Sequence, residues 1–276
     1  MRTLPSRATF VDTHCHLDMS DFEDDLANIL DRALVQGVES IITIGIDLAS
    51  SHRAIELARQ HSCIWAAIGV HPHDVHSATE ATYATLEALV TANHNLIVGY
   101  GEIGLDYVKK RSEPELQRQH FRRQLEIAKK LRLPVIIHDR DAHTDTLNIL
   151  KECGPLPQGG VMHCFSGDMA FAEKIIDLGF YISVPGIVTF KNAHTLHDVA
   201  RMIPLTSLLI ETDAPFLAPH PLRGKRNEPS FVVHTAACIA RLRDIPLTDL
   251  AHATTANAAS LFHFPPHETP HPTPRS

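Results

Sequence analysis

The stretch Phe10-Val11-Asp12-Thr13-His14-Cys15-His16-Leu17-Asp18 combines an apolar run, an acidic residue and two histidines two positions apart. Positions i and i+2 of a β-strand point to the same face, so we expect His14 and His16 to project together while Cys15 points away. Two imidazoles on one face at the end of a buried strand form half of a metal site. Taken alone, the pair also fits two hydrogen-bonded core or surface histidines, because the chain holds 20 histidines.

Outside this stretch, short apolar runs alternate with longer amphipathic segments, and the alternation occurs eight times. Strands are predicted over 9–13, 40–46, 64–70, 96–101, 134–138, 160–163, 180–184 and 207–212. Helices are predicted over 22–36, 51–61, 83–93, 115–131, 144–153, 169–178 and 196–202, with two further helices at 231–243 and 247–261. Apolar strands that are each followed by a helix indicate a parallel sheet buried on both faces. Eight such units in 276 residues favour a (β/α)8 TIM barrel, with an open doubly wound sheet as the alternative.

No linker or shift in composition marks a second domain, so we expect one barrel over 9–264, an N-terminal extension over 1–8 and a disordered Pro/His-rich tail over 265–276. The net charge of −7 argues against a protein that coats duplex nucleic acid. Five scattered cysteines without a Cys-X-X-Cys pair indicate reduced thiols. Without a secretory signal or an apolar run near the ~20 residues of a membrane span, we expect a cytoplasmic protein.

The active site of a TIM barrel lies at the carboxyl ends of its strands, so the polar residues that end the predicted strands are the candidates for chemistry. These strand-terminal residues are His14, His16, Glu102, His138, His163 and Asp213. Four imidazoles and two carboxylates on one rim can hold two metal ions, with one carboxylate bridging and an open position on each ion for water. Unconnected structural roles for each residue are the alternative.

Further residues near this rim have two interpretations each. His71 is either a ligand or a hydrogen-bonding neighbour of one, and Glu211 either orients a ligand histidine or forms a buried salt bridge. Tyr107 lines the substrate cleft or caps a loop, as does Asp106. Arg223, Arg226 and Arg140 are candidates for gripping phosphate, while a solvated charged loop is the alternative for the first two.

Five motifs in this order resemble the TatD family of metal-dependent hydrolases in the amidohydrolase superfamily, some members of which are described as deoxyribonucleases. The motifs are Phe10–Asp18, Gly101–Tyr107, Pro134–Arg140, His163–Gly167 and Leu209–Pro215, and the resemblance runs from about Thr9 to Leu261. It implies that His14 and His16 hold a first metal and that Glu102 bridges. It also implies that His138 and His163 bind a second metal, and that Asp213 binds metal and takes a proton from water.

Together these observations predict a hydrolase with two divalent ions that activates water, most simply a deoxyribonuclease acting from the 3′ ends of single-stranded DNA. The runner-up is an amidohydrolase-type enzyme that cleaves a small amide, lactone or ester, and a non-catalytic metal-binding protein is a third possibility. Four histidines favour Zn²⁺, Mn²⁺ or Ni²⁺, whereas the resemblance to the nuclease members points to Mg²⁺. We expect no membrane contact and no obligate protein partner.

Overall fold

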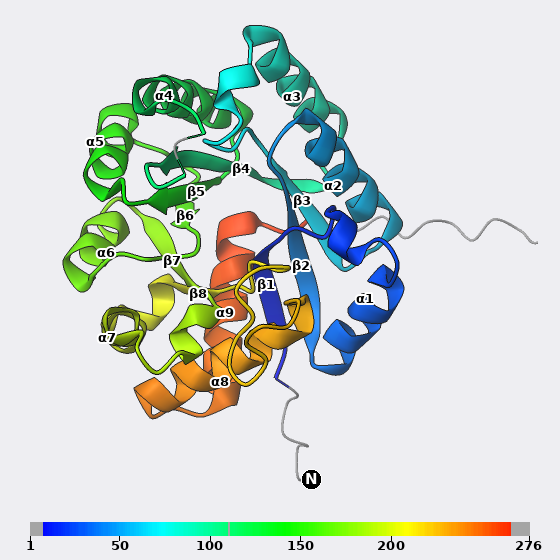
Figure 1. The fold of residues 1–276 in the computed structure, drawn as a ribbon, viewed down its shortest axis with the longest axis vertical. Helices are drawn as coiled ribbons and strands as arrows, with labels where there is room; N and C mark the ends of the chain where they lie inside the picture. The colour runs from blue at the N-terminus through cyan, green and yellow to red at the C-terminus, as the bar shows by residue number, and fades with distance from the viewer. Residues whose placement is uncertain (1–7, 110, 266–276) are drawn as a thin grey trace, which may run out of the picture.

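The computed structural model of the chain describes residues 8–109 and 111–265, and within them eight parallel strands lie side by side in chain order (Figure 1). The strands are β1 (Phe10–Cys15), β2 (Val38–Gly45), β3 (Ile64–Ile68), β4 (Ile97–Asp106), β5 (Val135–Arg140), β6 (Gly160–Met162), β7 (Phe180–Val184) and β8 (Leu208–Ile210). A doubly wound sheet would reverse its strand order at a switch point. The order from β1 to β8 has no reversal, so the predicted TIM-barrel class is confirmed and the open-sheet alternative is wrong.

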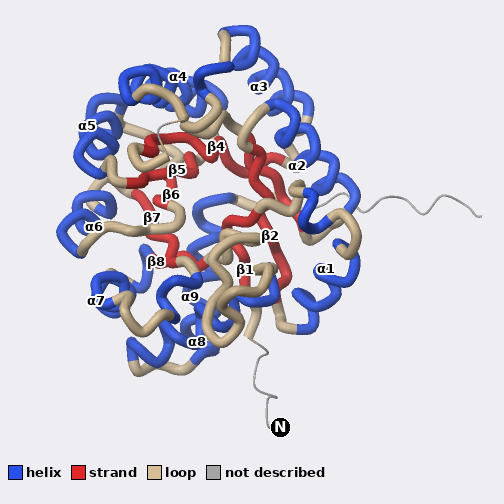
Figure 2. The backbone as a smooth tube through the Cα atoms, in the orientation of Figure 1, coloured by secondary structure: helices blue, strands red, loops and turns tan. Residues whose placement is uncertain are grey.

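Helices surround this strand ring, as Figure 2 shows by colour. They are α1 (Leu26–Val35), α2 (Leu48–Gln60), α3 (Glu80–Ala92), α4 (Pro114–Leu131), α5 (His143–Cys153), α6 (Met169–Ile176), α7 (His194–Met202), α8 (Val232–Arg243) and α9 (Leu247–Phe262). Short 3₁₀ segments lie at Ser20–Phe22, Val75–Ser77, Gly186–Thr189, Leu205–Ser207 and Pro229–Phe231. The two predicted C-terminal helices are α8 and α9. The predicted extension and tail lie outside the described residues apart from Ala8 and Pro265.

Several elements differ from the predicted boundaries, and local hydrogen bonds explain two of them. Helix α2 begins at Leu48 rather than residue 51 because the Asp47 carboxylate accepts the backbone N–H of Ser50. Helix α3 begins at Glu80 rather than residue 83 because Thr79 caps it in the same way. Strand β8 ends at Ile210, before the predicted end at residue 212.

Strands β1 and β4 each carry a local bulge, at which the strand has one residue more than the neighbouring strand opposite. Asp12 and Cys15 of β1 pair with Ile41 and Thr43, so three steps face two. Tyr100 and Ile103 of β4 pair with Val135 and Ile137 in the same manner. Such bulges bend a strand and redirect its side chains, and here they flank the two strand positions predicted to hold metal ligands.

Apolar side chains fill the barrel on both sides of the strands. On β2 and β3 the alternation is clear, because Ile42, Ile44, Trp65 and Ala67 belong to one buried cluster while Ile41, Ile64, Ala66 and Ile68 belong to another. The first cluster also contains Ala258, Leu261 and Phe262 of α9, so this helix packs against the barrel interior. The second cluster joins the strands to the surrounding helices. Both faces of the sheet are therefore buried, as the continuously apolar strands predict.

The junction between β8 and β1 differs from the other strand contacts. Across the described residues these two strands share no ladder, only an isolated bridge between Cys15 and Ala214. Side chains add to it, since Thr13 Oγ1 donates to the Ile210 carbonyl at 3.0 Å and the Thr212 backbone N–H donates to Asp12 Oδ1 at 2.9 Å. The barrel is nearly closed, and at this junction side-chain hydrogen bonds add to the few backbone contacts that close it.

None of the helices formed by residues 8–109 and 111–265 has both the length and the apolar character that a membrane crossing requires.

Candidate metal centre

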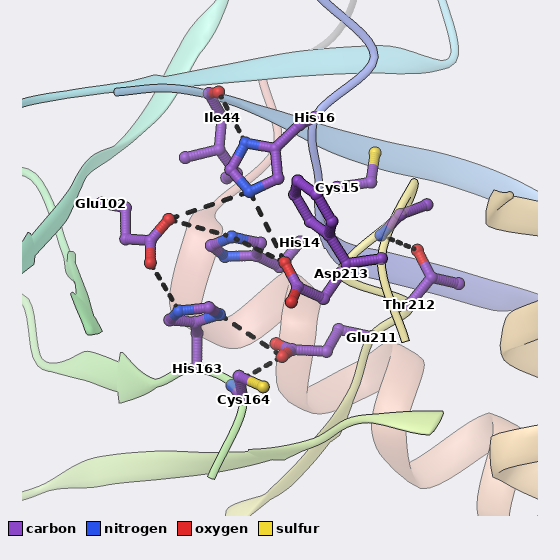
Figure 3. A network of polar contacts seen from close by, with 12 residues as sticks. His14, Cys15, His16, Ile44, Glu102, His163, Cys164, Glu211, Thr212 and Asp213 are labelled. Carbon is purple, nitrogen blue, oxygen red and sulfur yellow. Dashed lines mark hydrogen bonds and ion pairs between the residues drawn. The ribbon is translucent and has the colours of Figure 1, made fainter. Parts of the chain in front are cut away.

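Six side chains predicted to bind metal converge at the carboxyl ends of the strands. His14 comes from β1, Glu102 from β4 and His138 from β5, while His16, His163 and Asp213 follow β1, β6 and β8. All except His138 are less than a tenth exposed. Figure 3 shows five of the six turned toward one another, with Glu102 facing both histidines of β1 and His163. The structure thus assembles the whole predicted ligand set from five strands.

The two carboxylate oxygens of Glu102 face different groups. Oε2 lies 3.4 Å from His14 Nε2 and 3.9 Å from His16 Nε2. Oε1 lies 2.5 Å from His138 Nδ1 and 2.7 Å from His163 Nε2. Asp213 completes the first group, because its Oδ1 is 3.5 Å from His16 Nε2 and 3.8 Å from His14 Nε2. A carboxylate placed in this way can bridge two cations.

The chemistry of these donors fits divalent metal ions. Both ring nitrogens of His14 are buried without a hydrogen-bond partner, which is costly for an imidazole that binds nothing. Potential ligand groups within the described residues are His14–His16–Glu102, His14–His163–Glu211 and His71–Glu102–His138. Imidazoles with carboxylates suit Zn²⁺, Mn²⁺ or Ni²⁺.

The charges in the site favour a bound cation. Burial alone would raise the pKa of Glu102, yet the surrounding His163, His71 and His138 hold it well below its usual range. The pKa of Asp213 is also lowered, against the effect of its burial, by its contacts with His16 and His14. Two ionised carboxylates in a buried pocket need positive charge nearby. Divalent ions provide it without requiring every histidine to be protonated.

Glu211 approaches His163 from the side opposite Glu102, which is where a carboxylate that orients the ring would lie. Its side chain is fully buried, and Oε1 accepts the backbone N–H of Cys164 at 2.6 Å and lies 3.4 Å from His163 Nδ1 (Figure 3). The outer nitrogen of His163 therefore faces a carboxylate while its inner nitrogen faces Glu102. This arrangement fixes the ring and strengthens the histidine as a ligand.

Asp106 lies against His138 much as Glu211 lies against His163. The sequence analysis did not predict this contact. Its Oδ2 lies 3.4 Å from His138 Nε2 and 2.8 Å from His73 Nε2, while Oδ1 accepts the N–H groups of Val108 and Lys109. The loop-capping role is correct, and the contact with His138 comes in addition. The signal in the sequence was the period of two from Glu102, which places residues 102, 104 and 106 on one strand face. Strand β4 reaches Asp106, whereas the predicted strand ended at residue 101.

Asp12 ties the two strands of the first ligand group together and was not singled out from the sequence. Its Oδ2 accepts the Thr212 hydroxyl at 2.6 Å, and the Asp213 backbone N–H donates to the His14 carbonyl at 2.9 Å. Asp213 itself has a φ of 57°, a left-handed conformation that aspartate tolerates better than most residues. The backbone thus turns sharply after β8, and this turn aims the Asp213 carboxylate at His14 and His16.

His71 also lies in the site, with its Nε2 3.4 Å from Glu102 Oε1. Burial lowers its pKa to about 4, so the ring is neutral at pH 7. Cys15 points away from the two flanking histidines, as predicted, and its thiol donates to the Ile42 carbonyl at 3.6 Å. It is a packed thiol rather than a nucleophile.

The predicted substrate-binding residues have other contacts in the structure. Arg226 pairs with Asp25 at 2.6 Å and donates to the Asp21 carbonyl, so its guanidinium is bound to the segment that precedes α1. The Arg223 guanidinium lies over the Phe190 ring, 4.6 Å from its centroid. The Tyr107 hydroxyl donates to Asp145 at 2.6 Å and accepts from Arg118. Arg140 is exposed at the end of β5, beside the predicted ligand His138.

Residues 11–263 match the family described as "TatD related DNase". Over 92% of its length the chain is 44% identical to the uncharacterized metal-dependent hydrolase YabD of Bacillus subtilis (98% of that protein) and 40% identical to YcfH of Escherichia coli K12 (96%). The fold is similar to the crystal structure of YjjV, a TatD homolog from Escherichia coli K12. There the TM-score is 0.89 and the identity 34%, covering 94% of this chain and 99% of that one. The ligand set, the nearly closed barrel and these similarities agree: the chain belongs to the TatD family of metal-dependent hydrolases.

Proposed function

We propose that this hydrolase is a deoxyribonuclease that removes nucleotides from the 3′ ends of single-stranded DNA. The observation that carries the proposal is Glu102, whose two oxygens face separate groups of imidazoles. A pair of divalent ions held in this way would stabilise charge on both the attacking and the leaving oxygen of a phosphodiester and acidify a water molecule. The match to a family described as DNases supports DNA as the substrate.

Asp213 is the residue proposed to accept a proton from the attacking water. Its carboxylate lies across from Glu102 beside His14 and His16, and its lowered pKa keeps it ionised at neutral pH. A carboxylate at that place can take the proton while Glu102 keeps its bridging position. The other ligand side chains hold the reacting groups in place rather than transfer protons.

Phe216 supports a single-stranded substrate. Its ring is 48% exposed, and its centroid lies 6.1 Å from that of the His16 imidazole. An exposed aromatic ring at the mouth of a buried ionic site is suited to stack a nucleobase without regard to its identity. Arg140 and Arg223 are the cations proposed to contact the adjoining phosphates.

The second candidate function is hydrolysis of a small amide, lactone or ester at the same centre. It gains support from Arg226 and Tyr107, because the ion pair to Asp25 and the hydrogen bond to Asp145 engage two of the groups predicted to bind substrate. A site with fewer free cations has less affinity for a polyanion.

The test uses metal-stripped protein and a 5′-labelled single-stranded oligonucleotide, with Mg²⁺, Mn²⁺ and Zn²⁺ added back separately. We expect a ladder that shortens from the 3′ end with wild type and an intact oligonucleotide with Asp213→Asn. An oligonucleotide left intact by protein that demonstrably holds metal would favour the small-molecule hydrolase. Replacing Arg140 and Arg223 with glutamine should cripple phosphodiester cleavage and leave hydrolysis of a neutral amide or ester nearly unchanged.

A further inference from the structure

Three of the site histidines share one arrangement of their outer ring nitrogens, a hydrogen bond for His16 and a close approach to a carboxylate for His138 and His163. In each, the ring nitrogen that points away from the Glu102 cluster faces an oxygen acceptor. The pairs are His16 Nδ1 with the Ile44 carbonyl at 3.3 Å, His163 Nδ1 with Glu211 at 3.4 Å and His138 Nε2 with Asp106 at 3.4 Å. An acceptor there draws the proton of a neutral imidazole to the outer nitrogen, so the inner nitrogen presents a lone pair to a metal.

His71 shows the opposite pattern. Its outer nitrogen, Nδ1, accepts the backbone N–H of His73 at 3.0 Å. A backbone N–H can only donate, so Nδ1 must be unprotonated, and a neutral His71 must carry its proton on Nε2. That nitrogen lies 3.4 Å from Glu102 Oε1. A protonated Nε2 has no lone pair to offer a metal, whereas it can donate to a carboxylate.

The N–H of His73 is held in place from several directions. The His71 backbone N–H donates to the Ile46 carbonyl and the His71 carbonyl accepts from Asp74, both at 2.9 Å, which fixes the turn that follows β3. The His73 ring is anchored by Asp106 at 2.8 Å. Turning the His73 N–H away from His71 would therefore disturb the contact of the His73 ring with Asp106. Asp106 in turn lies beside His138.

We propose that His71 is a positioning residue that donates a hydrogen bond from Nε2 to Glu102, and that it is not a metal ligand. The second group of protein ligands is then Glu102, His138 and His163 alone. The side of that group facing His71 stays free for water and substrate. The proposal requires only the metal dependence of the family and is independent of whether the substrate is DNA.

The first experiment counts metal ions per chain and measures metal affinity for wild type, His71→Leu, His71→Gln and His163→Leu. Glutamine retains an N–H donor near the position of Nε2, while leucine retains only volume. We expect both His71 variants to bind as many ions as wild type and His163→Leu to bind one fewer. With bis(4-nitrophenyl) phosphate as substrate, His71→Leu should lower kcat by about 10- to 100-fold with KM little changed, and His71→Gln should recover much of it. Loss of one ion in His71→Leu would overturn the proposal.

A second experiment needs no variant. Nitrogen NMR of ¹⁵N-histidine-labelled wild-type protein loaded with Zn²⁺ distinguishes the two nitrogens of each ring. We expect the His71 ring to show a protonated Nε2 and a free Nδ1, and the His16, His138 and His163 rings to show a metal-bound inner nitrogen. A His71 Nε2 bound to Zn²⁺ would contradict the proposal even if the leucine variant failed to fold. Neither the ion count nor the NMR result depends on nuclease activity, so this proposal can fail separately from the proposed function.

Discussion

At the scale of single residues, we propose that Glu211 controls the site by orienting a ligand histidine rather than by binding the metal itself. It is fully buried, and its contacts to the Cys164 N–H and His163 fix one ligand ring. We expect Glu211→Gln to lower metal affinity or activity by about 10- to 100-fold, because the amide leaves the outer nitrogen of His163 with a weaker partner. Metal competition titration measures this.

The matched control for that variant is Glu228→Gln. Glu228 is also buried, yet its partners are Arg32 and Ser230 rather than a site histidine. This control should lower stability with metal affinity unchanged. Equal metal affinities for Glu211→Gln and wild type would contradict the orienting role.

Phe216 carries a prediction about substrate. If its exposed ring stacks on a terminal base, Phe216→Ala should raise the KM for an oligonucleotide by about tenfold, because base–aromatic stacking contributes ~1–3 kcal/mol. Phe216→Tyr retains the aromatic face and should behave like wild type. An alanine variant with unchanged KM would remove Phe216 from the binding surface.

The candidate ligands could be picked out from the sequence because they are local features: each is a polar residue at or near the carboxyl end of an apolar strand. The partners of the arginines were not predictable in this way. Arg226 reaches Asp25, and Arg32 reaches Glu228, across almost the whole chain. No spacing rule within a segment encodes such contacts, because they depend on how the loop after β8 packs against the region of α1.

At the scale of elements, the predicted strand order and helix alternation hold while several boundaries and registers do not. Strict alternation describes β2 and β3, but the extra residues in β1 and β4 interrupt it next to His14 and Glu102. No residue type marks these bulges in the sequence, so they become visible only in the register with the neighbouring strand. The sequence therefore predicts which residues come together, but it predicts less well the direction in which their side chains point.

The start of α5 provides a prediction of pH dependence. His143 Nδ1 lies 2.7 Å from Asp139, and this hydrogen bond raises the pKa of His143 above its ordinary value of 6.5. A raised pKa in the folded state means that the pair stabilises the fold fully below pH 6.5 and loses this effect as the pH rises through the folded pKa. The carboxylate also offsets the unfavourable position of a cation at a helix N-terminus.

We therefore expect His143→Gln to destabilise the protein by on the order of 0.5 kcal/mol at pH 6, a value kept small because the ring is partly exposed, and by less at pH 9. Denaturant titrations at the two pH values give the difference. His52→Gln, an exposed position on α2, serves as control and should show no such difference. A penalty that grows with pH would show the sign to be wrong.

The junction between β8 and β1 makes a second prediction at this scale. His14 and His16 belong to one side of the junction and Asp213 to the other, so a cation held by all three would link the two sides. At an ion concentration of about 100 times Kd, amide exchange of residues 10–16 and 208–214 should slow by up to ~100-fold where exchange requires the junction to open. Hydrogen–deuterium exchange with and without metal measures this, and the β6–β7 ladder serves as the internal reference. Equal slowing in both regions would contradict a local link.

For the whole molecule, the net charge of −7 constrains how a polyanion can bind. If Arg140 and Arg223 each contact one phosphate of a single strand, log KM should rise with log salt concentration with a slope of about 1.4, because each contact contributes about 0.7. Each glutamine variant should reduce that slope by about half. KM measured across a salt series tests this, and a much steeper slope would indicate an additional basic surface.

The same junction also bears on how the protein is made. During synthesis His14 and His16 emerge from the ribosome well before Asp213, so a growing polypeptide displays the imidazole pair without its carboxylate partner. His14 and His16 become buried only when β8 docks against β1. We therefore expect a cation to be held at this half of the site only after β8 has docked against β1, so that metal binding there would report a closed barrel.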